Sequence, residues 1–466
     1  MAVKPRVPSG MRDFTAREVR QREWVIGRIR SVFERFGFEP IETPSLELFE
    51  TLKGKLGEEG EQLLFKVLRR GTALEQLRLG RVPAVTVTDY DEVVDCALLY
   101  DLTVPFSRFL AMHPELPLPF KRYQIQPVWR ADRPQRGRYR EFYQCDIDTA
   151  GTPSMLADAE VIAVVMEVLL DLGFSEFQTR IGHRKILDGL VEAAGGGGHF
   201  RAISVAIDKL DKIGLPGVRE EMEKSGVPGE VAGKILQTIG LEGGEDDLLT
   251  VLERMLAGTR LGPAGVSETR ELFTFLRALG APAGRYRLDL SLARGLDYYT
   301  GPVHESIVTR PAIGSLTGGG RYDGLIGRFT GNEVPATGTS LGLERIIDVM
   351  KEFHMLPESG SATLVLVTIF DPSTMEAALQ LASELRRAGI ATEVPLKPAR
   401  GLKPQIAYAS GKGIPLLAIL GPDEIASGTV TLRAGPGNQK RVARQDAVAE
   451  IRAFDAGRTT LEERKE

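Results

Sequence analysis

The chain opens with a helical pattern that has a clear beginning and end. Thr15, followed three residues later by Glu18, forms a capping box in which each side chain satisfies a backbone amide of the first turn. Apolar residues then recur at near-helical spacing at Val19, Ile26, Ile29, Phe33 and Phe36. Gly37 can adopt the left-handed backbone that commonly ends a helix. The pattern therefore predicts a helix between Thr15 and Gly37.

Residues 38–48 favour an extended chain. They include Pro40 and Pro44, and a residue without a backbone donor fits an edge strand better than a central one. Strand-like alternation then covers residues 98–150. A stripe of apolar residues predicts a helix from Ser154 to Leu172.

Residues from about 185 to 280 have a different character. Short amphipathic patterns are separated by glycine clusters, such as Gly195 to Gly198, and strand signals are few. The strand pattern resumes at Tyr286 and runs to about Ile313. We therefore expect a helical insertion within a mainly antiparallel domain. The expected boundaries are 1–184 for the first part of that domain, 185–282 for the insertion and 283–354 for the second part.

A change of composition separates the C-terminal part. Residues 355–361 include Pro357, Gly360 and two serines, and they predict a linker. From 362 to 466, strand and helix patterns alternate over roughly 100 residues, which is typical of a compact α/β domain.

The overall composition excludes several classes of protein. The 466 residues carry a formal net charge of -4, which excludes a generally basic nucleic-acid coat but permits a local basic groove. Cys96 and Cys145 are the only cysteines and the histidines lack ligand spacing, so we expect neither a disulfide framework nor a metal held by the protein. No run approaches the ~20 apolar residues of a membrane span, and the N-terminus lacks a signal-peptide core. We expect a cytoplasmic protein with no membrane partner.

The segment Ala293 to Gly301 carries the first sign of chemistry. It places Arg294, Asp297 and the pair Tyr298-Tyr299 within six residues. Neither a surface turn nor a plain core strand needs this mixture, because buried charges must be paired. A polar pocket for a small ligand with an amine and a ring explains it better. Taken alone, the segment could also be a strand end with an incidental ion pair.

Residues 127–146 alternate arginines with turn-forming residues. They predict a β-hairpin whose loop carries Arg133, Arg136, Arg138 and Arg140. Planar, always-charged guanidinium groups suit phosphate oxygens, although a solvated basic loop is the alternative. Arg130 lies in an apolar strand beside Val128 and Trp129, where an unpaired charge would be costly.

In a third segment, the small residues of 336–342 lead into a predicted helix whose first turn carries Glu344 and Arg345. Glycines permit close backbone approach to a flat ligand, and the arginine can reach a phosphate. Such junctions are common, so this segment gains meaning only beside the other two.

Together and in this order, the three segments resemble the motif set of the class II aminoacyl-tRNA synthetases, most closely that of the histidyl-tRNA synthetase family. Residues 294–300 are similar to that family's histidine-binding motif, and Gly318 to Leu325 to its companion glycine-rich element. Residues 101–106 resemble its amino-acid-contacting strand, and 38–46 resemble the class II dimerisation motif. The resemblance covers nearly the whole chain.

This resemblance implies a fold and an assembly. The fold is of the α+β class, with an antiparallel sheet, flanking helices and a helical insertion. The C-terminal α/β domain, residues 362–466, corresponds to an anticodon-binding domain. A homodimer would form through residues 38–48.

The resemblance also implies a two-step reaction. ATP and L-histidine give histidyl-adenylate, and the histidyl group then moves to the 3′ end of tRNA(His). Arg130 and Arg294 match the catalytic arginines, which stabilise charge developing on the α-phosphate. The residues that match ATP contacts are Arg130, Asp132, Arg138 and Arg345. ATP is a substrate, and Mg²⁺ would bridge its phosphates and would not sit in a protein cage.

The histidine-binding positions divide into two sets. Asp101, Thr103 and Gln144 match positions around the backbone of the amino acid, where Arg130 and Arg294 also reach. Asp148, Tyr298 and Tyr299 match positions around the imidazole, where a carboxylate and phenols can hold both ring nitrogens. Because no other natural amino acid offers that two-nitrogen pattern, no editing domain is expected.

Two positions depart from the family's pattern. Leu99 stands where relatives commonly have arginine, and His304 where a hydrophobic or aromatic residue is usual.

Two rival functions share this fold. One is a regulatory subunit of ATP phosphoribosyltransferase, a class that usually lacks the anticodon-binding domain and loses the arginine motifs. The other is a module that senses uncharged tRNA without chemistry. Intact Arg130, Arg294 and Arg345 favour the ligase over both.

Overall fold

Two long strands pair antiparallel over their whole length. Strand β5 (Phe120–Trp129) pairs with β6 (Glu141–Ala150), from Phe120 opposite Ala150 to Trp129 opposite Glu141. In this computed structural model the pair belongs to an eight-stranded sheet with the order β1-β5-β6-β11-β10-β9-β7-β8. The remaining strands are β1 (Glu39–Pro40), β7 (Gln178–His183), β8 (Tyr286–Leu288), β9 (Pro302–Ile307), β10 (Thr317–Arg321) and β11 (Ala336–Gly342).

The structure describes residues 4–53, 61–69, 93–293, 298–357, 360–396 and 401–457. By packing, the chain divides into two compact units, which are described separately here. The first comprises residues 1–13 and 22–356, and the second comprises residues 14–21 and 357–466.

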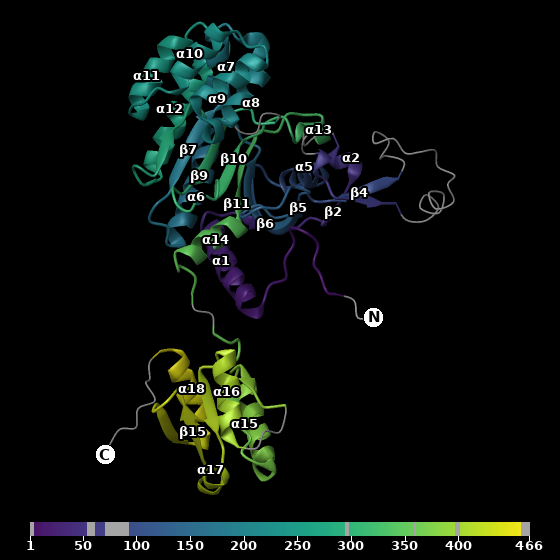
Figure 1. The fold of residues 1–466 in the computed structure, drawn as a ribbon, viewed down its shortest axis with the longest axis vertical. Coiled ribbons are helices and arrows are strands. Elements are labelled where there is room, and N and C mark those ends of the chain that lie inside the picture. The colour runs from purple at the N-terminus through teal and green to yellow at the C-terminus, as the bar shows by residue number, and fades with distance from the viewer. Residues whose placement is uncertain are drawn as a thin grey trace. The chain divides into compact units, whose positions relative to one another are not determined.

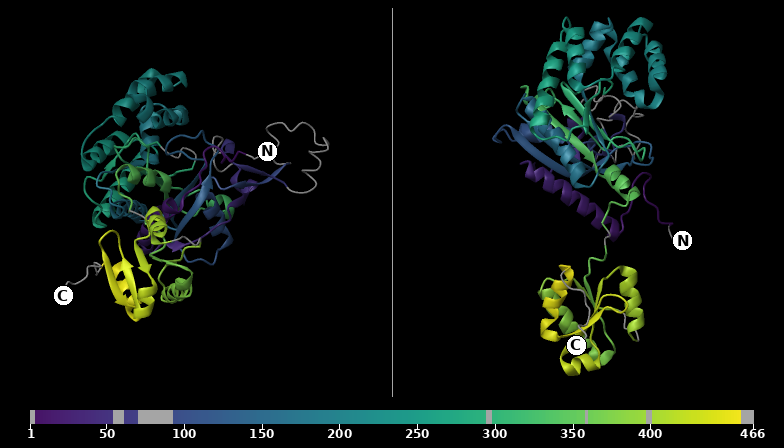
Figure 2. Two further views of the ribbon diagram at one scale, coloured as in Figure 1. Left: turned by 60° about the horizontal axis from the view of Figure 1, so that its bottom comes forward. Right: turned by 90° about the vertical axis from the view of Figure 1, so that its left-hand side faces the viewer.

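The two faces of the large sheet differ because side chains alternate along each strand. On one face, strand residues join a buried core with helices α1 (Ala16–Arg35), α6 (Met155–Asp171) and α14 (Leu343–Glu352). The strand residues in that core include Tyr123, Cys145, Ile147 and Leu341. The right-hand view of Figure 2 shows the purple helix α1 lying along the sheet. The opposite face is polar and holds the candidate site.

The antiparallel fold expected from the sequence is confirmed, with one addition. The six strands from β5 to β7 pair antiparallel, and β1 and β8 each add a parallel strand at an edge. Pro40 lies in the edge strand β1, as its missing donor predicts. The predicted first helix is also present, because Thr15 and Glu18 exchange the capping-box hydrogen bonds and Gly37 adopts a φ of 74°.

Two expectations about strands were wrong. Residues 101–106 were expected to be a strand, but helix α5 (Thr103–Met112) begins there. The amide of Val104 donates to Oδ1 of Asp101 at 3.2 Å, and Pro105 lies in the first turn, where its missing N–H costs nothing. The strand pattern expected from Tyr286 to Ile313 is interrupted, since β8 ends at Leu288 and β9 begins at Pro302.

A helical insertion separates β7 from β8. Its helices gather at one end of the sheet, above β7 and β10 in Figure 1. They are α7 (Arg184–Ala193), α8 (Phe200–Asp208), α9 (Leu210–Lys224), α10 (Gly229–Ile239), α11 (Glu245–Leu256) and α12 (Gly262–Ala278). Their buried side chains belong to the same hydrophobic core as the apolar face of the large sheet.

The first unit also contains a small three-stranded sheet. It has the order β2-β4-β3, from β2 (Leu46–Leu48), β4 (Val94–Leu98) and β3 (Lys66–Leu68). The short helices of this unit are α2 (Phe49–Leu52) and α13 (Gly327–Thr330).

The second unit is an α/β domain built on a five-stranded mixed sheet of order β13-β12-β14-β15-β16. Its strands are β12 (Val365–Val367), β13 (Thr392–Glu393), β14 (Leu416–Ile419), β15 (Thr429–Arg433) and β16 (Gln439–Ala443). Helices α15 (Met375–Arg387) and α18 (Ala447–Asp455) pack on one face and α16 (Leu402–Lys412) on the other. The sequence reading missed β16 and the short helix α17 (Pro422–Ser427).

Candidate active site

The polar face of the large sheet is built from matched positions on three neighbouring strands. Directly opposed residues of an antiparallel pair point to the same face, so the register groups them into rows. One row contains Arg122, Asp148 and Gly338, the next contains Gln124, Asp146 and Ser340, and the third contains Gln126, Gln144 and Gly342. We call these nine residues the polar face.

Asp148 is a buried carboxylate of the polar face. Its side chain is 3% exposed and lies 2.6 Å from the guanidinium of Arg122, which is fully buried. The hydroxyl of Tyr322 donates to its other oxygen. Burial raises the pKa of Asp148 to about 6, and Arg122 opposes that rise. The carboxylate is therefore oriented by two partners before any ligand arrives.

Gln144 and Asp146 occupy the same strand face as Asp148. The Gln144 amide donates to the Ser340 hydroxyl at 2.7 Å. Asp146 is 2% exposed, and burial raises its pKa to about 7. Oε1 of Gln144 and Oδ1 of Asp146 are both buried without a hydrogen-bond partner in the described part of the chain. Buried polar atoms normally have one, so these acceptors mark a place for a ligand.

Asp101, Arg130 and the tyrosine pair lie close to this face. Loss of solvent raises the pKa of Asp101, which the charges of Arg130 and Arg122 lower. The ring of Tyr298 lies 4.3 Å from that of Tyr299 and meets Tyr322 edge-on at 6.4 Å between centroids. Burial raises the pKa of Tyr298 well above its usual value, so this phenol stays protonated as a donor.

Arg130 leaves the end of β5 with its guanidinium held between two aromatic rings. Its Nε donates to the carbonyl of Tyr100 at 3.0 Å. Its central carbon lies 4.3 Å from the centre of the Tyr100 ring and 5.2 Å from that of Phe142. Within the described residues the two Nη groups make no hydrogen bond, so they are available to an anion.

The predicted hairpin contacts the third segment, which contains residues 336–345. Residues 130–140 connect β5 to β6, and Arg138 pairs with the buried carboxylate of Asp132 at 2.7 Å. Arg345, in the first turn of α14, donates from Nε to the carbonyl of Gly137 at 2.9 Å. Three of the four predicted ATP contacts thus surround one hairpin, with Arg130 at its base.

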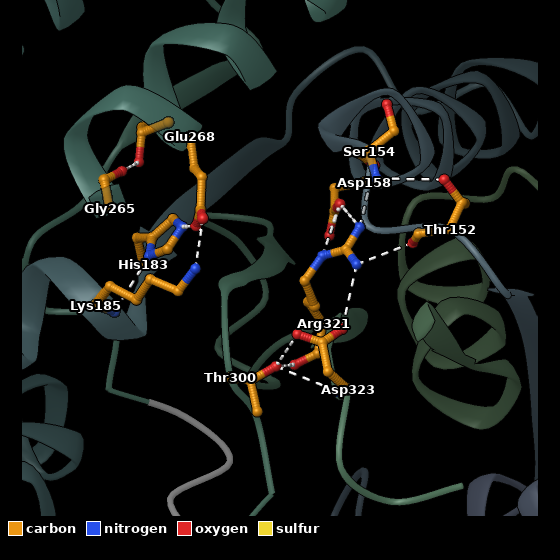
Figure 3. Close-up of polar contacts among 11 residues, drawn as sticks. Thr152, Ser154, Asp158, His183, Lys185, Gly265, Glu268, Thr300, Arg321 and Asp323 are labelled. Carbon is orange, nitrogen blue, oxygen red and sulfur yellow. Dashed lines mark hydrogen bonds and ion pairs between the residues drawn. The ribbon is translucent and has the colours of Figure 1, made fainter. Parts of the chain in front are cut away.

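A buried network holds the segment that follows the tyrosines. Arg321 is 3% exposed and binds the carboxylates of Asp158 and Asp323 (Figure 3). The hydroxyl of Thr300 donates to Asp323 at 2.8 Å, and the amide of Thr300 donates to the carbonyl of Arg321. This network fixes the residue next to Tyr299 against strand β10.

Several predicted site residues need separate mention. Arg294 lies outside the described residues, as does Asp297. Thr103 is the first residue of α5, two positions after Asp101. Leu99 is completely buried in a small apolar cluster with Leu102 and Val128.

The sequence reading assigned no role to three residues of this site, namely Arg122, Asp146 and Tyr322. A usable signal existed, because residues 122, 124 and 126 and residues 144, 146 and 148 are all polar at alternate positions. That period of two places them on one face of their strands. Their pairing across strands needs the register, which a single sequence does not provide.

Neither a metal cluster nor a membrane helix is found in the described ranges. No group of three or more His, Cys, Asp or Glu side chains there could hold a metal ion. No helix among those residues is long and apolar enough to cross a membrane.

Comparison with known proteins identifies the family. The family model described as Histidyl-tRNA synthetase matches residues 10–78 and 72–346, and the one described as Anticodon binding domain matches 363–454. The histidine–tRNA ligase of Cytophaga hutchinsonii is 40% identical over 432 residues, which are 92% of this chain and 95% of that protein. That of Aeropyrum pernix is 40% identical over 452 residues, 96% of this chain and 98% of that protein.

Solved structures are also similar to this chain. The histidyl-tRNA synthetase of Nostoc sp. PCC 7120 superimposes with a TM-score of 0.80 at 32% identity, covering 97% of this chain and all of that one. An ATP phosphoribosyltransferase regulatory subunit/histidyl-tRNA synthetase of Bacillus halodurans C has a TM-score of 0.71 at 24% identity, covering 90% of this chain and all of that one, which is a likeness of fold. Because the family match spans most of the residues and 40% identical relatives span nearly all of them, this chain belongs to the histidyl-tRNA synthetase family.

Proposed function

We propose that this chain is an aminoacyl-tRNA ligase that joins L-histidine to tRNA(His) at the expense of ATP. The observation that carries the proposal is the juxtaposition of Arg130 with the polar face. The guanidinium of Arg130 can bind an anion, and it stands beside the buried acceptors of Gln144 and Asp146. An α-amino acid in contact with a phosphate would require both kinds of group.

In the first step, a carboxylate oxygen of histidine attacks the α-phosphorus of ATP and pyrophosphate leaves. Negative charge spreads over the phosphoryl oxygens, and Arg130 is placed to receive it with its two Nη groups. We assign Arg294 to the opposite side of the same phosphate, where it would act together with Arg130. Arg138 and Arg345 would contact the outer phosphates, and Asp132 would lie near the adenine.

Selection of histidine rests on the imidazole. Asp148 can accept from one ring N–H, while the phenols of Tyr298 and Tyr299 can donate to the other ring nitrogen. Asp101, Thr103 and Gln144 would surround the backbone of the amino acid. An amino acid without two ring nitrogens would leave these buried groups unpaired, which is the strongest form of rejection that a site can apply.

Three further assignments complete the proposal. Mg²⁺ would arrive with ATP and bind chiefly through its phosphates. The second unit, which matches an anticodon-binding domain, would bind tRNA(His). Two chains would associate through residues 38–48, where strand β1 forms an edge of the large sheet.

Histidine-dependent exchange of pyrophosphate into ATP tests the function directly. The purified protein should catalyse exchange with L-histidine and not with other amino acids. Arg294→Ala should lower the exchange rate by ~10² to 10³ while the melting temperature stays close to that of the parent. Absence of exchange would contradict the ligase and favour a regulatory or tRNA-sensing protein of the same fold.

A further inference from the structure

Asp146 is the central carboxylate of the polar face. It stands on β6 between Gln144 and Asp148, and its cross-strand partners are Gln124 on β5 and Ser340 on β11. Its side chain is 2% exposed, and Oδ1 has no hydrogen-bond partner among the described residues.

Among the described residues, no protein group donates a hydrogen bond to Oδ1 of Asp146. The amide of Gln124 donates to Thr43 and Gln126 and therefore turns away. Ser340 accepts from Gln144, so its single proton is the one hydroxyl donor it can offer to Asp146, and it lowers the pKa of that carboxyl.

Arg122 is the buried cation of the polar face, and its hydrogen bonds and ion pair are with groups other than Asp146. Arg122 forms its ion pair with Asp148 and donates to the carbonyl of Leu102 at 3.1 Å. Its charge reaches Asp146 and lowers the pKa of that carboxyl, but among the described residues it forms no hydrogen bond to Asp146, since Nη1 donates to Oε1 of Gln124 at 3.3 Å and Nε has no partner.

A second acceptor lacks a donor at the same place. Oε1 of Gln144, two residues earlier on the same strand face, is buried and has no hydrogen-bond partner in the part of the chain that the structure describes. A buried acceptor left without a donor is costly, and more so when it carries a charge. A ligand that fills both positions needs several N–H groups and a positive charge. The substrate carries one group of that description beside its imidazole, the α-ammonium.

We propose that Asp146 binds the α-ammonium group of histidine, sharing it with Gln144 and with Asp101. This assignment rests on the proposed function and adds a substrate-binding residue to it. The ammonium would then lie over the middle row of the polar face, with the imidazole directed toward Asp148 in the adjoining row.

The charge balance of the site agrees with this role. Burial raises the pKa of Asp146 to about 7, with Arg122 lowering it and Asp148 and Asp101 raising it further. An ammonium ion at Oδ1 favours the ionised carboxylate, so binding of histidine would release a proton from the fraction of sites that hold one. The facing groups that carry charge are Arg122, Asp148 and Asp101, and all three remain in the variant used below.

Three probes separate contact with the ammonium from contact with the ring or the carboxylate. L-histidine carries all three groups, histamine lacks the carboxylate, and 3-(imidazol-4-yl)propionate lacks the ammonium. The isosteric variant Asp146→Asn removes the charge and little else. By equilibrium titration it should bind L-histidine and histamine roughly 10- to 100-fold more weakly than the parent, since a hydrogen bond to a charged group is lost. Its affinity for imidazolepropionate should change less than about twofold.

Asp289→Asn is the matched control. Asp289 is a buried carboxylate that follows β8, and its ion pair with Arg180 lies outside the polar face and outside residues 38–48. This variant should bind all three probes as the parent does. If Asp146→Asn does not fold, Asp146→Ser takes its place in the same comparison, and failure of both to fold would show that Asp146 is a structural residue and would overturn the proposal.

The remaining outcomes are equally decisive. Equal weakening of all three probes, or no weakening of any, would overturn the role given to Asp146. Those results would leave the ligase function standing as long as the parent binds L-histidine. A parent protein that binds no L-histidine would instead contradict the proposed function.

Discussion

The guanidinium of Arg122 lies 2.6 Å from the carboxylate of Asp148, and neither side chain has appreciable contact with solvent. Two charges withdrawn from water in this way contribute little net stability together, but each is costly without the other. The pair keeps a carboxylate ionisable at the floor of the site, with Tyr322 bonded to its second oxygen. Asp148 is thus positioned by the fold and not by its ligand.

Removal of Arg122 should therefore be strongly destabilising. Arg122→Met leaves Asp148 buried beside one hydroxyl donor, and we expect the free energy of unfolding to fall by about 3–5 kcal/mol. Denaturant unfolding of parent and variant measures this. The double variant Arg122→Met, Asp148→Leu should recover part of the loss, because the carboxylate that pairs with Arg122 is removed as well, although Asp146 and Asp101 still lose the charge of Arg122. A single variant as stable as the parent would refute the account.

The position of Asp148 also depends on the absence of a side chain at Gly338. This glycine is the cross-strand neighbour of Asp148, and a Cβ atom placed there would overlap the Asp148 carboxylate and the carbonyl of Ile147. Gly338→Ala should displace Asp148 and raise KM for L-histidine by roughly tenfold or more, as expected when a hydrogen bond to a charged group is lost. The KM for ATP should change little.

The control for this substitution is Gly233→Ala. Gly233 lies in helix α10, and a Cβ atom there meets nothing within 4 Å. Alanine is a better helix former than glycine, so this variant should be slightly more stable than the parent and equally active. An unchanged KM for histidine in Gly338→Ala would show that Asp148 can move without loss.

The sequence predicted the outline of this site because its signals are local. Alternation with a period of two located the hairpin. Arg130 lies beside apolar neighbours, where an unpaired charge would be costly, and this position predicted that its guanidinium has a partner or a ligand. The start of α5 was missed because one contact decides it. The residues Thr103 and Val104 favour a strand, whereas the Asp101 carboxylate accepts the Val104 amide and starts a helix.

Arg122 and Asp146 were missed for a different reason. Each is one polar residue among several at alternate positions, a pattern that a solvent-facing strand would also show. The buried state of this face, and the pairing of Arg122 with Asp148, depend on which strands lie side by side. That information comes from contacts between segments far apart in the sequence.

The proposed dimer gives a further prediction. Leu46 and Leu48 lie on β2 within the 38–48 segment and are 46% and 49% exposed. Replacing both with Lys should place charges in the interface and yield a monomer in sedimentation equilibrium. Leu170→Lys is the control, because Leu170 on α6 is similarly exposed, at 40%, but lies outside this segment. A parent that is monomeric at working concentration would remove the basis of the proposal.

His304 makes the stability of the protein depend on pH. It lies on β9, is 1% exposed and pairs across strands with Gly319 and Ile181. Burial lowers its pKa to about 3, from about 6.5 in an unfolded chain. Between these values the unfolded state binds a proton here that the native state does not. The contribution of His304 to stability is therefore lost as pH falls below about 6.5, by about 1.4 kcal/mol per pH unit.

The comparison with His304→Leu isolates this contribution. Asp146 and Asp148 have raised pKa values, about 7 and about 6, so their contributions to stability increase as pH falls and oppose that of His304. They remain in both proteins and cancel in the difference. Denaturant unfolding at several pH values should show a constant difference above pH ~6.5 and one that moves steadily in favour of the leucine variant below it. A difference that does not vary with pH would mean that His304 takes up a proton in the native protein as readily as in the unfolded chain.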